Sequence, residues 1–222
     1  MTTYIRNYFA ILIISISAGL LYNSWPFGYW LNPTTSKLSL ASGLEAPGQP
    51  YNWMFIGGDV VSSVLVIVFA YLLWRVYQDR KSKRVNWVII SLIGYSVFTI
   101  ADALYPVTCI PNLQNCPSFV HEPTLIIHGF FSITASLFLF ASLFILWFHE
   151  RKNVIMNVLI IGYILFGLFS LIDALAPGKN SNWSQHYYIS LCSVWLILIP
   201  YVLLTLFPAK INKKSALRQE AD

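Results

Sequence analysis

Long apolar segments recur along the chain and alternate with short polar stretches. An α-helix rises about 1.5 Å per residue, so about 20 apolar residues cross a hydrocarbon core about 30 Å thick. We place six such spans at residues 8–22, 53–74, 86–104, 124–148, 154–175 and 187–207. The segments between them are too short to build a separate soluble core. The pattern therefore predicts an all-α polytopic membrane protein, in which residues 1–222 form one domain of six transmembrane helices with a tail at residues 209–222.

The composition supports a membrane protein. Hydrophobic residues make up 57% of the chain and charged residues only 10%, whereas soluble domains carry about 25% charged residues. The first span is the shortest, and Ser17-Ala18-Gly19 faintly resembles the cleavage site of a signal peptide. We expect this span to remain as a helix, because the internal repeat described below requires it.

The basic residues predict the orientation. Lys and Arg concentrate in the cytoplasmic loops of membrane proteins. If the N-terminus is cytoplasmic, twelve of the 14 basic residues lie on the cytoplasmic side, and only Lys37 and Lys179 lie outside. We therefore predict that both termini are cytoplasmic. The basic clusters then serve topology and contact with anionic membrane lipids, and we expect no nucleic-acid partner.

Two cysteines occupy the loop predicted to lie outside between the third and fourth spans. Cys109 and Cys116 are seven residues apart, with Pro111 and Pro117 favouring turns. In an oxidising compartment this spacing indicates a local disulfide. A metal site is the weaker interpretation, because the third cysteine, Cys192, falls within the sixth span and the spacing of zinc ligands is missing.

A short pattern recurs at each hairpin on the predicted outer side. Asp-Ala-Leu-x-Pro begins at Asp102 and again at Asp173, and His-x-x-x-Ser begins at His128 and again at His186. Asp59 opens a related Asp-x-x-x-Ser at the start of the second span. The repeat predicts three helical hairpins of related design. It places serines one helical turn after the polar residues, namely Ser63, Ser132 and Ser190.

These residues form one predicted polar layer in the outer third of the membrane. Charged groups at such depth are costly and usually face the bundle interior, so the layer is a candidate functional site. Zinc could be held by His128, His186 and Asp59. The candidate catalytic residues are Asp59, Asp102, Ser132, Asp173 and Ser190.

Structural interpretations compete with these roles. Asp102 and Asp173 could hydrogen-bond the turn at a helix end, and the two histidines could bond a neighbouring helix at the interface. The serines could bond the carbonyl four residues before them. Asp59 is harder to explain in this way, because it lies well inside its span, where a carboxylate needs a partner.

The sequence also resembles a known family. The resemblance rests on the segment from Leu38-Ser-Leu-Ala-Ser-Gly-Leu-Glu-Ala-Pro to Trp53, on Gly58-Asp59, on residues 102–109 with Cys116, and on His128-x-x-x-Ser132. Together these resemble bacterial membrane proteins of the domain of unknown function 998 family. The resemblance implies a six-helix core in a bacterial cytoplasmic membrane and a paired-cysteine outer loop, but no established activity. The polar pattern is only distantly similar to alkaline ceramidases, from which this chain differs by one fewer helix and the lack of His-x-x-x-His.

Three functions remain open on this basis. The first is a zinc-dependent hydrolase or transferase acting on a lipid-linked substrate at the outer leaflet. The second is a non-enzymatic membrane module, such as a lipid-binding, envelope or assembly factor, whose polar layer ties the helices together. The third is a small proton-coupled transporter, which the apolar inner halves of the spans make less favoured.

Overall fold

The structure, a computed structural model, describes residues 2–34, 41–78, 82–108, 123–175 and 183–206. Six helices in these ranges are long and apolar enough to cross a membrane, as the sequence predicts. Three short helical segments lie on the connections between the first two of them. The elements are α1 (Thr2–Tyr22), η1 (Trp25–Phe27), α2 (Gly28–Leu31), η2 (Ala41–Glu45), α4 (Asn52–Tyr77), α5 (Lys83–Leu104), α6 (Pro123–His149), α7 (Val154–Leu175) and α8 (Trp183–Leu206).

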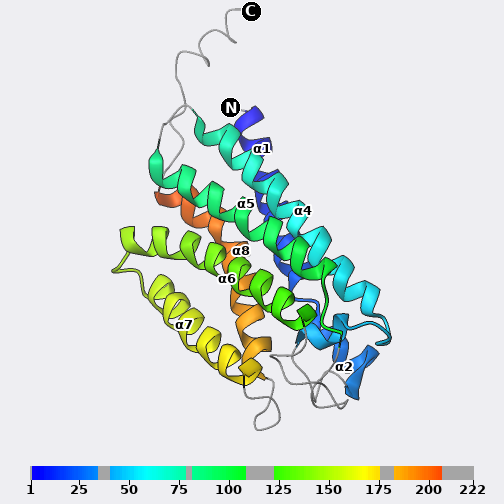
Figure 1. Cartoon of the computed structure of the whole chain (residues 1–222). Coiled ribbons are helices and arrows are strands. Elements are labelled where there is room, and N and C mark those ends of the chain that lie inside the picture. The colour runs from blue at the N-terminus through cyan, green and yellow to red at the C-terminus, as the bar shows by residue number, and fades with distance from the viewer. Residues whose placement is uncertain (1, 35–40, 79–81, 109–122, 176–182, 207–222) are drawn as a thin grey trace, which may run out of the picture.

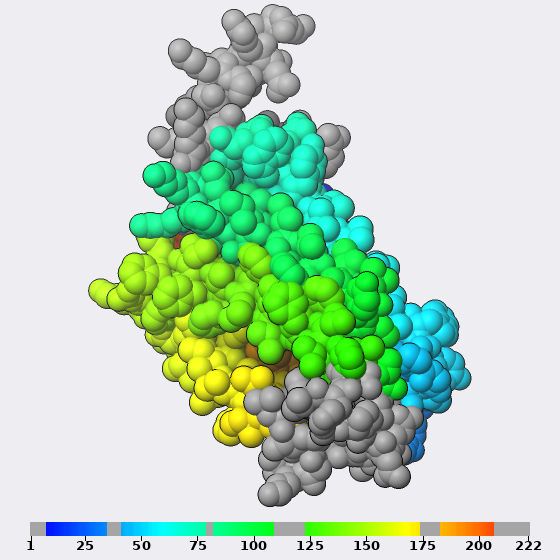
Figure 2. Space-filling model, viewed as in Figure 1, coloured from blue at the N-terminus to red at the C-terminus, as the bar shows by residue number. Residues whose placement is uncertain are grey.

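The six long helices form a closed bundle. Each packs against its neighbours in the chain, and α8 returns to pack along α1 (Figure 1). The helices alternate in direction, so the start of α1 and the end of α8 lie at the same end of the bundle. Figure 2 shows α5 and α6 across one face, with α7 beside them and α4 at the opposite edge.

The core draws large side chains from every long helix. Trp195 of α8 is fully buried, and its indole Nε1 donates to Ser142 Oγ of α6 at 2.8 Å. Many apolar side chains point outward instead, for example Leu137 and Val158, each 61% exposed. A soluble protein rarely exposes such extensive apolar surface, and lipid tails cover it in a membrane.

The packing of α1 on α8 compensates for a proline inside a transmembrane helix. Pro200 has no backbone N–H, so the carbonyl of Leu196, four residues earlier, lacks its usual helical donor. Ser15 Oγ of α1 donates to that carbonyl at 2.7 Å. In a bilayer, where water cannot satisfy the group, this bond replaces the missing one and fixes the two helices together.

Glycines allow α1 to approach its neighbours closely. A Cβ added to Gly19 would lie 2.8 Å from the carbonyl oxygen of Ser193 on α8, and one added to Gly58 of α4 would lie 3.2 Å from that of Leu21. Small residues at such crossings are typical of membrane helices. The first span is therefore an integral part of the bundle, with α4 and α8 on either side.

Candidate acid–histidine site

Four polar side chains meet at the end of the bundle where α4 and α6 begin and α5 ends. Asp102 lies in the last turn of α5, His128 in the second turn of α6, and Asp59 about 10 Å into α4. Glu45 is the last residue of η2, which packs against α4. Because antiparallel helices bring alternate ends together, residues far apart in sequence share this position. We call Glu45, Asp59, Asp102 and His128 the acid–histidine site.

Asp102 and His128 form its best-defined contact. His128 Nδ1 lies 2.9 Å from Asp102 Oδ1, and the two side chains are only 7% and 17% exposed, respectively. The same nitrogen lies 3.1 Å from the backbone carbonyl oxygen of Tyr105. A carbonyl oxygen can only accept, so we infer that Nδ1 carries a hydrogen. In the neutral ring, Nε2 then keeps its lone pair and can act as a base.

The local sequence explains this geometry. Pro106 prevents α5 from continuing. The helix ends at Leu104, and the N–H of the following residue, Tyr105, donates to the carbonyls of Ala101 and Asp102. The carbonyl of Tyr105 is then directed at the histidine instead of along a helix. The Asp-Ala-Leu-Tyr-Pro motif thus brings two oxygens, one of a carboxylate and one of the backbone, within 3.1 Å of a single ring nitrogen.

Glu45 and Asp59 form the second half of the site. Their carboxyl groups lie close enough to interact, and a hydrogen bond between two carboxyl groups requires a proton on one of them. Burial raises the pKa of Glu45 well above its usual range, and the nearby charges of Asp59 and Asp102 raise it further. We therefore infer that Glu45 carries the proton and donates to Asp59.

A short segment covers the site. In η2 and the residue after it, Leu44 is 1% exposed, Glu45 9% and Ala46 2%. Ala46 packs with Val107, after α5, and with Leu125 of α6. We call residues 41–46 the cap. It holds a carboxyl group over three helix ends and keeps it out of water.

Glu45 is a site residue that the repeat pattern in the sequence does not include. It lies outside the six predicted spans, in a loop where an acidic residue is expected to contact water. A usable signal was present, because Glu45 is flanked by Leu44 and Ala46 within the segment that carries the family resemblance. An acidic residue between apolar neighbours in an outer loop is a candidate for burial with a partner.

The second copy of the Asp–His pattern makes different contacts. Asp173 accepts a hydrogen bond from the hydroxyl of Ser184 at the start of α8. His186 is 1% exposed and packs among aromatic rings, with its centroid 4.4 Å from that of Trp25 and 6.0 Å from that of Trp183. The predicted polar layer is therefore divided. Asp59, Asp102 and His128 lie in the acid–histidine site, whereas Asp173 bonds to Ser184 and His186 lies in an aromatic cluster.

The predicted serines also differ from one another. Ser190 Oγ accepts from the indole Nε1 of Trp25 at 3.3 Å and lies 3.1 Å from Asn23 Oδ1, so it ties α8 to the segment after α1. Ser63 is fully buried, and its hydroxyl has no hydrogen-bond partner within the described residues. Ser132 is half-buried one turn after His128. Each catalytic role remains a prediction.

The predicted zinc ligands are not gathered into one set. Among the residues that the structure describes, no three His, Cys, Asp or Glu side chains are arranged to hold a metal ion. His128 contacts Asp102, and His186 lies among aromatic rings. The predicted disulfide of Cys109 and Cys116 lies outside the described residues, and Cys192 is a buried free thiol in α8.

Comparison with known families identifies the group. A family model described as "Protein of unknown function (DUF998)" matches residues 10–209. The chain belongs to this family. The match covers α1 from residue 10 and the other five long helices of this DUF998 protein entirely, and it includes the whole acid–histidine site. No protein of curated function and no solved structure matches the chain.

Proposed function

We propose that this DUF998 protein is a hydrolase or transferase that acts on a lipid-linked substrate, with acid–base chemistry supplied by the acid–histidine site. The observation that carries the proposal is the convergence of three carboxyl groups and one histidine from four separate segments. Burying such groups is costly, and apolar residues of similar size would hold the helices together equally well. Groups of this kind in a membrane protein mark functional sites.

The contacts suggest a role for each residue. Asp102 orients the ring of His128 through Nδ1, which leaves Nε2 to take the proton from an attacking hydroxyl or water. Glu45, protonated, gives its proton to the leaving oxygen, and Asp59 holds Glu45 in place. The cycle closes when the proton on Nε2 returns to Glu45, directly or through water. The nucleophile loses one proton and the leaving oxygen gains one, so the transfer of the protons balances with the residues of the site.

The position of the site favours a lipid-linked substrate. Exposed aromatic side chains surround this end of the bundle, including Trp30 at 78% and Trp53 at 69%. Aromatic belts mark the membrane–water interface, so the site lies near the depth of lipid headgroups. A substrate with its acyl chains in the bilayer would present its polar linkage at that level.

The orientation is part of the proposal. The excess of Lys and Arg at the opposite end of the bundle supports a cytoplasmic location for both termini, which directs the acid–histidine site to the outer leaflet of a bacterial cytoplasmic membrane. The same orientation places Cys109 and Cys116 outside, where a disulfide forms readily.

The test compares changes in the two copies of the Asp-Ala-Leu-x-Pro motif, and the second copy serves as the control. The purified full chain is placed in vesicles of total polar lipid from bacterial membranes, and lipid products are followed by mass spectrometry. We expect Asp102→Asn and His128→Gln to reduce product formation by about 100-fold or more. Asp173→Asn, the same change in the other copy of the motif, is expected to leave the rate within a few-fold of wild type.

The alternative is a non-enzymatic module whose polar groups only join helices. The contacts of Asp173 with Ser184 and of Ser190 with Trp25 favour it, because these members of the predicted layer bond neighbouring segments. Thermal melting separates the two functions. If wild type yields no lipid product and Asp102→Asn lowers the melting temperature as its main effect, the module is correct and the enzyme proposal fails.

A further inference from the structure

We propose that the groove between α4 and α5, at the basic end of the bundle, binds an anionic phospholipid. The site is independent of the acid–histidine site and lies at the other end of the same helices. The groove holds an acyl chain, and Arg75, in the last turn of α4, binds the phosphate.

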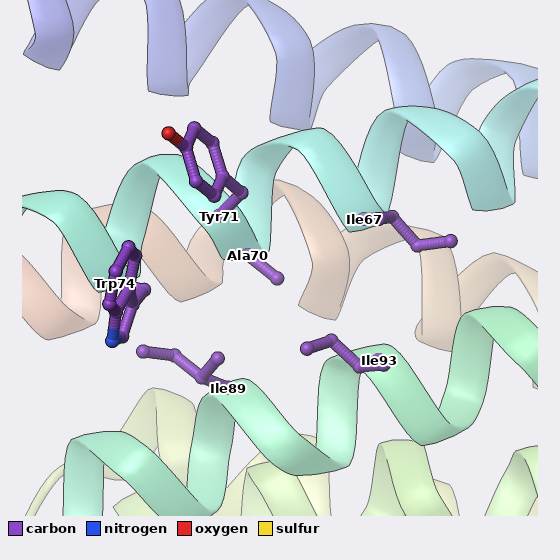
Figure 3. Close-up of a pocket in the computed structure, with 6 residues that line it drawn as sticks. All are labelled: Ile67, Ala70, Tyr71, Trp74, Ile89 and Ile93. Atoms are coloured by element: carbon purple, nitrogen blue, oxygen red, sulfur yellow. The ribbon is translucent and has the colours of Figure 1, made fainter.

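The groove is apolar and of suitable size. It has a volume of about 310 Å³ and is lined by Ile67, Ala70, Tyr71, Trp74, Ile89 and Ile93. Ligand pockets usually measure about 300–1,000 Å³. Figure 3 shows Trp74 and Ile89 at one end of the groove, with Ile67 and Ile93 at the other. Because Arg75 follows Trp74 in the last turn of α4, that end of the groove lies next to a basic residue.

Apolar shape alone cannot select a lipid. Lipid tails are as apolar in the bilayer as in the groove, so transfer of a chain brings little hydrophobic gain. Selection must come from the headgroup. The groove contributes to selection by holding the acyl chain so that the phosphate of the lipid lies beside the charged group at the mouth of the groove.

The charge at the mouth of the groove is cationic and is carried by Arg75, in the last turn of α4. In the sequence, Arg75 opens a basic segment, residues 75–84, with five basic residues and one acidic residue. Arg75 Nη1 donates to the hydroxyl of Tyr71, which lines the groove, at 3.0 Å. The described residues place no carboxylate in ion-pair distance of Arg75. On α5, Asn86 is exposed one turn before Ile89 on the same helix face, where its amide can donate to a phosphate oxygen.

The neighbouring Arg84 provides a matched control. It belongs to the same basic segment, but its Nη1 lies 2.9 Å from His149 Nδ1 at the end of α6. Its guanidinium therefore contacts α6, and Arg84 is not among the residues that line the groove. Neutralising Arg75 or Arg84 changes the net charge equally, and only Arg75 adjoins the groove.

The experiment is native mass spectrometry of the full chain in detergent, titrated with phosphatidylglycerol or with phosphatidylcholine of the same chains. We expect wild type to bind phosphatidylglycerol more tightly. Arg75→Gln should weaken that binding about fivefold, the effect of one basic residue near a membrane surface, and Arg84→Gln should leave it unchanged. Ile93→Trp, which fills the groove, should weaken binding of both lipids.

Three results would overturn the proposal. The first is equal binding of the two lipids by wild type. The second is an equal loss in Arg75→Gln and Arg84→Gln, which would indicate general attraction to the basic segment. The third is a wild-type dimer that Ile93→Trp dissociates, which would assign the groove to a second copy of the chain. Thermal melting checks that each variant is folded. If Ile93→Trp does not fold, Arg75→Gln, a change at the protein surface, still tests the proposal.

Discussion

Replacing Glu45 with glutamine tests the shared proton that joins the cap to the helices. Glutamine keeps the size of the side chain, and its amide can still donate to Asp59, but it cannot ionise. Glu45 is 9% exposed in the wild type, and burial raises the pKa of its carboxyl group well above the ordinary value of 4.5. The variant should therefore remove one specific dependence of stability on pH while leaving the packing of the cap intact.

The direction of the change of stability with pH follows from thermodynamic linkage. Below pH 4.5 the glutamate is neutral in both the folded and the unfolded chain and contributes no pH dependence. As the pH rises above that value, the unfolded chain loses the proton and the folded chain keeps it, so wild-type stability falls. The slope approaches about 1.4 kcal/mol per pH unit until the raised pKa is reached. For a protein of this size, that slope corresponds to about 3–6 °C in melting temperature per pH unit.

The assay is thermal melting in detergent at pH 5, 6, 7 and 8 for wild type, Glu45→Gln and the control Glu150→Gln. Glu150 follows α6 at the opposite end of the bundle. We expect the melting temperature of wild type to fall relative to that of Glu45→Gln as the pH rises, while Glu150→Gln follows wild type. Parallel curves for wild type and Glu45→Gln, or a wild type that gains stability over the variant with rising pH, would refute the buried proton.

Two predictions concern how α1 packs. Ser15→Ala should lower stability by about 1 kcal/mol, because it leaves the carbonyl of Leu196 without a donor. In a Pro200→Ala background the helical N–H returns, so thermal melts should show a smaller loss of stability on Ser15→Ala. An equal loss in both backgrounds would contradict the compensation. Gly19→Ala should destabilise the bundle, because the added Cβ clashes with α8. Gly57→Ala, whose added Cβ meets nothing within 4 Å, should stabilise the bundle by up to about 1 kcal/mol. Thermal melts in which both changes act alike would refute the close contact between α1 and α8.

The two copies of the Asp–His motif show how tertiary packing gives one pattern two outcomes. In the first copy, α6 packs mainly on α5, and His128 reaches the aspartate at the end of that helix. In the second copy, α8 packs on α1 as well as on α7, and His186 faces the aromatic rings that follow α1. The same short motif therefore forms an Asp–His pair in one hairpin and an aromatic contact in the other.

The sequence by itself determined the six helices and the residues that could carry chemistry. Apolar runs of membrane length have no stable alternative to helix in a bilayer, because every backbone polar group needs an internal partner. It also indicated Asp59 as a residue that needs a partner, and the structure places the carboxyl group of Glu45 beside it. These are local properties, set by side-chain polarity and helix length.

Only the tertiary structure decided which polar groups meet. The partner of Asp59 comes from a loop 14 positions earlier, and the partner of Asp102 lies 26 positions later on another helix. Such pairings depend on which helix faces are adjacent and on how the cap folds back over the helix ends. Helical periodicity places a residue on a face but does not say what that face contacts, so the acid–histidine site arises from the packing of α4, α5 and α6 beneath the cap.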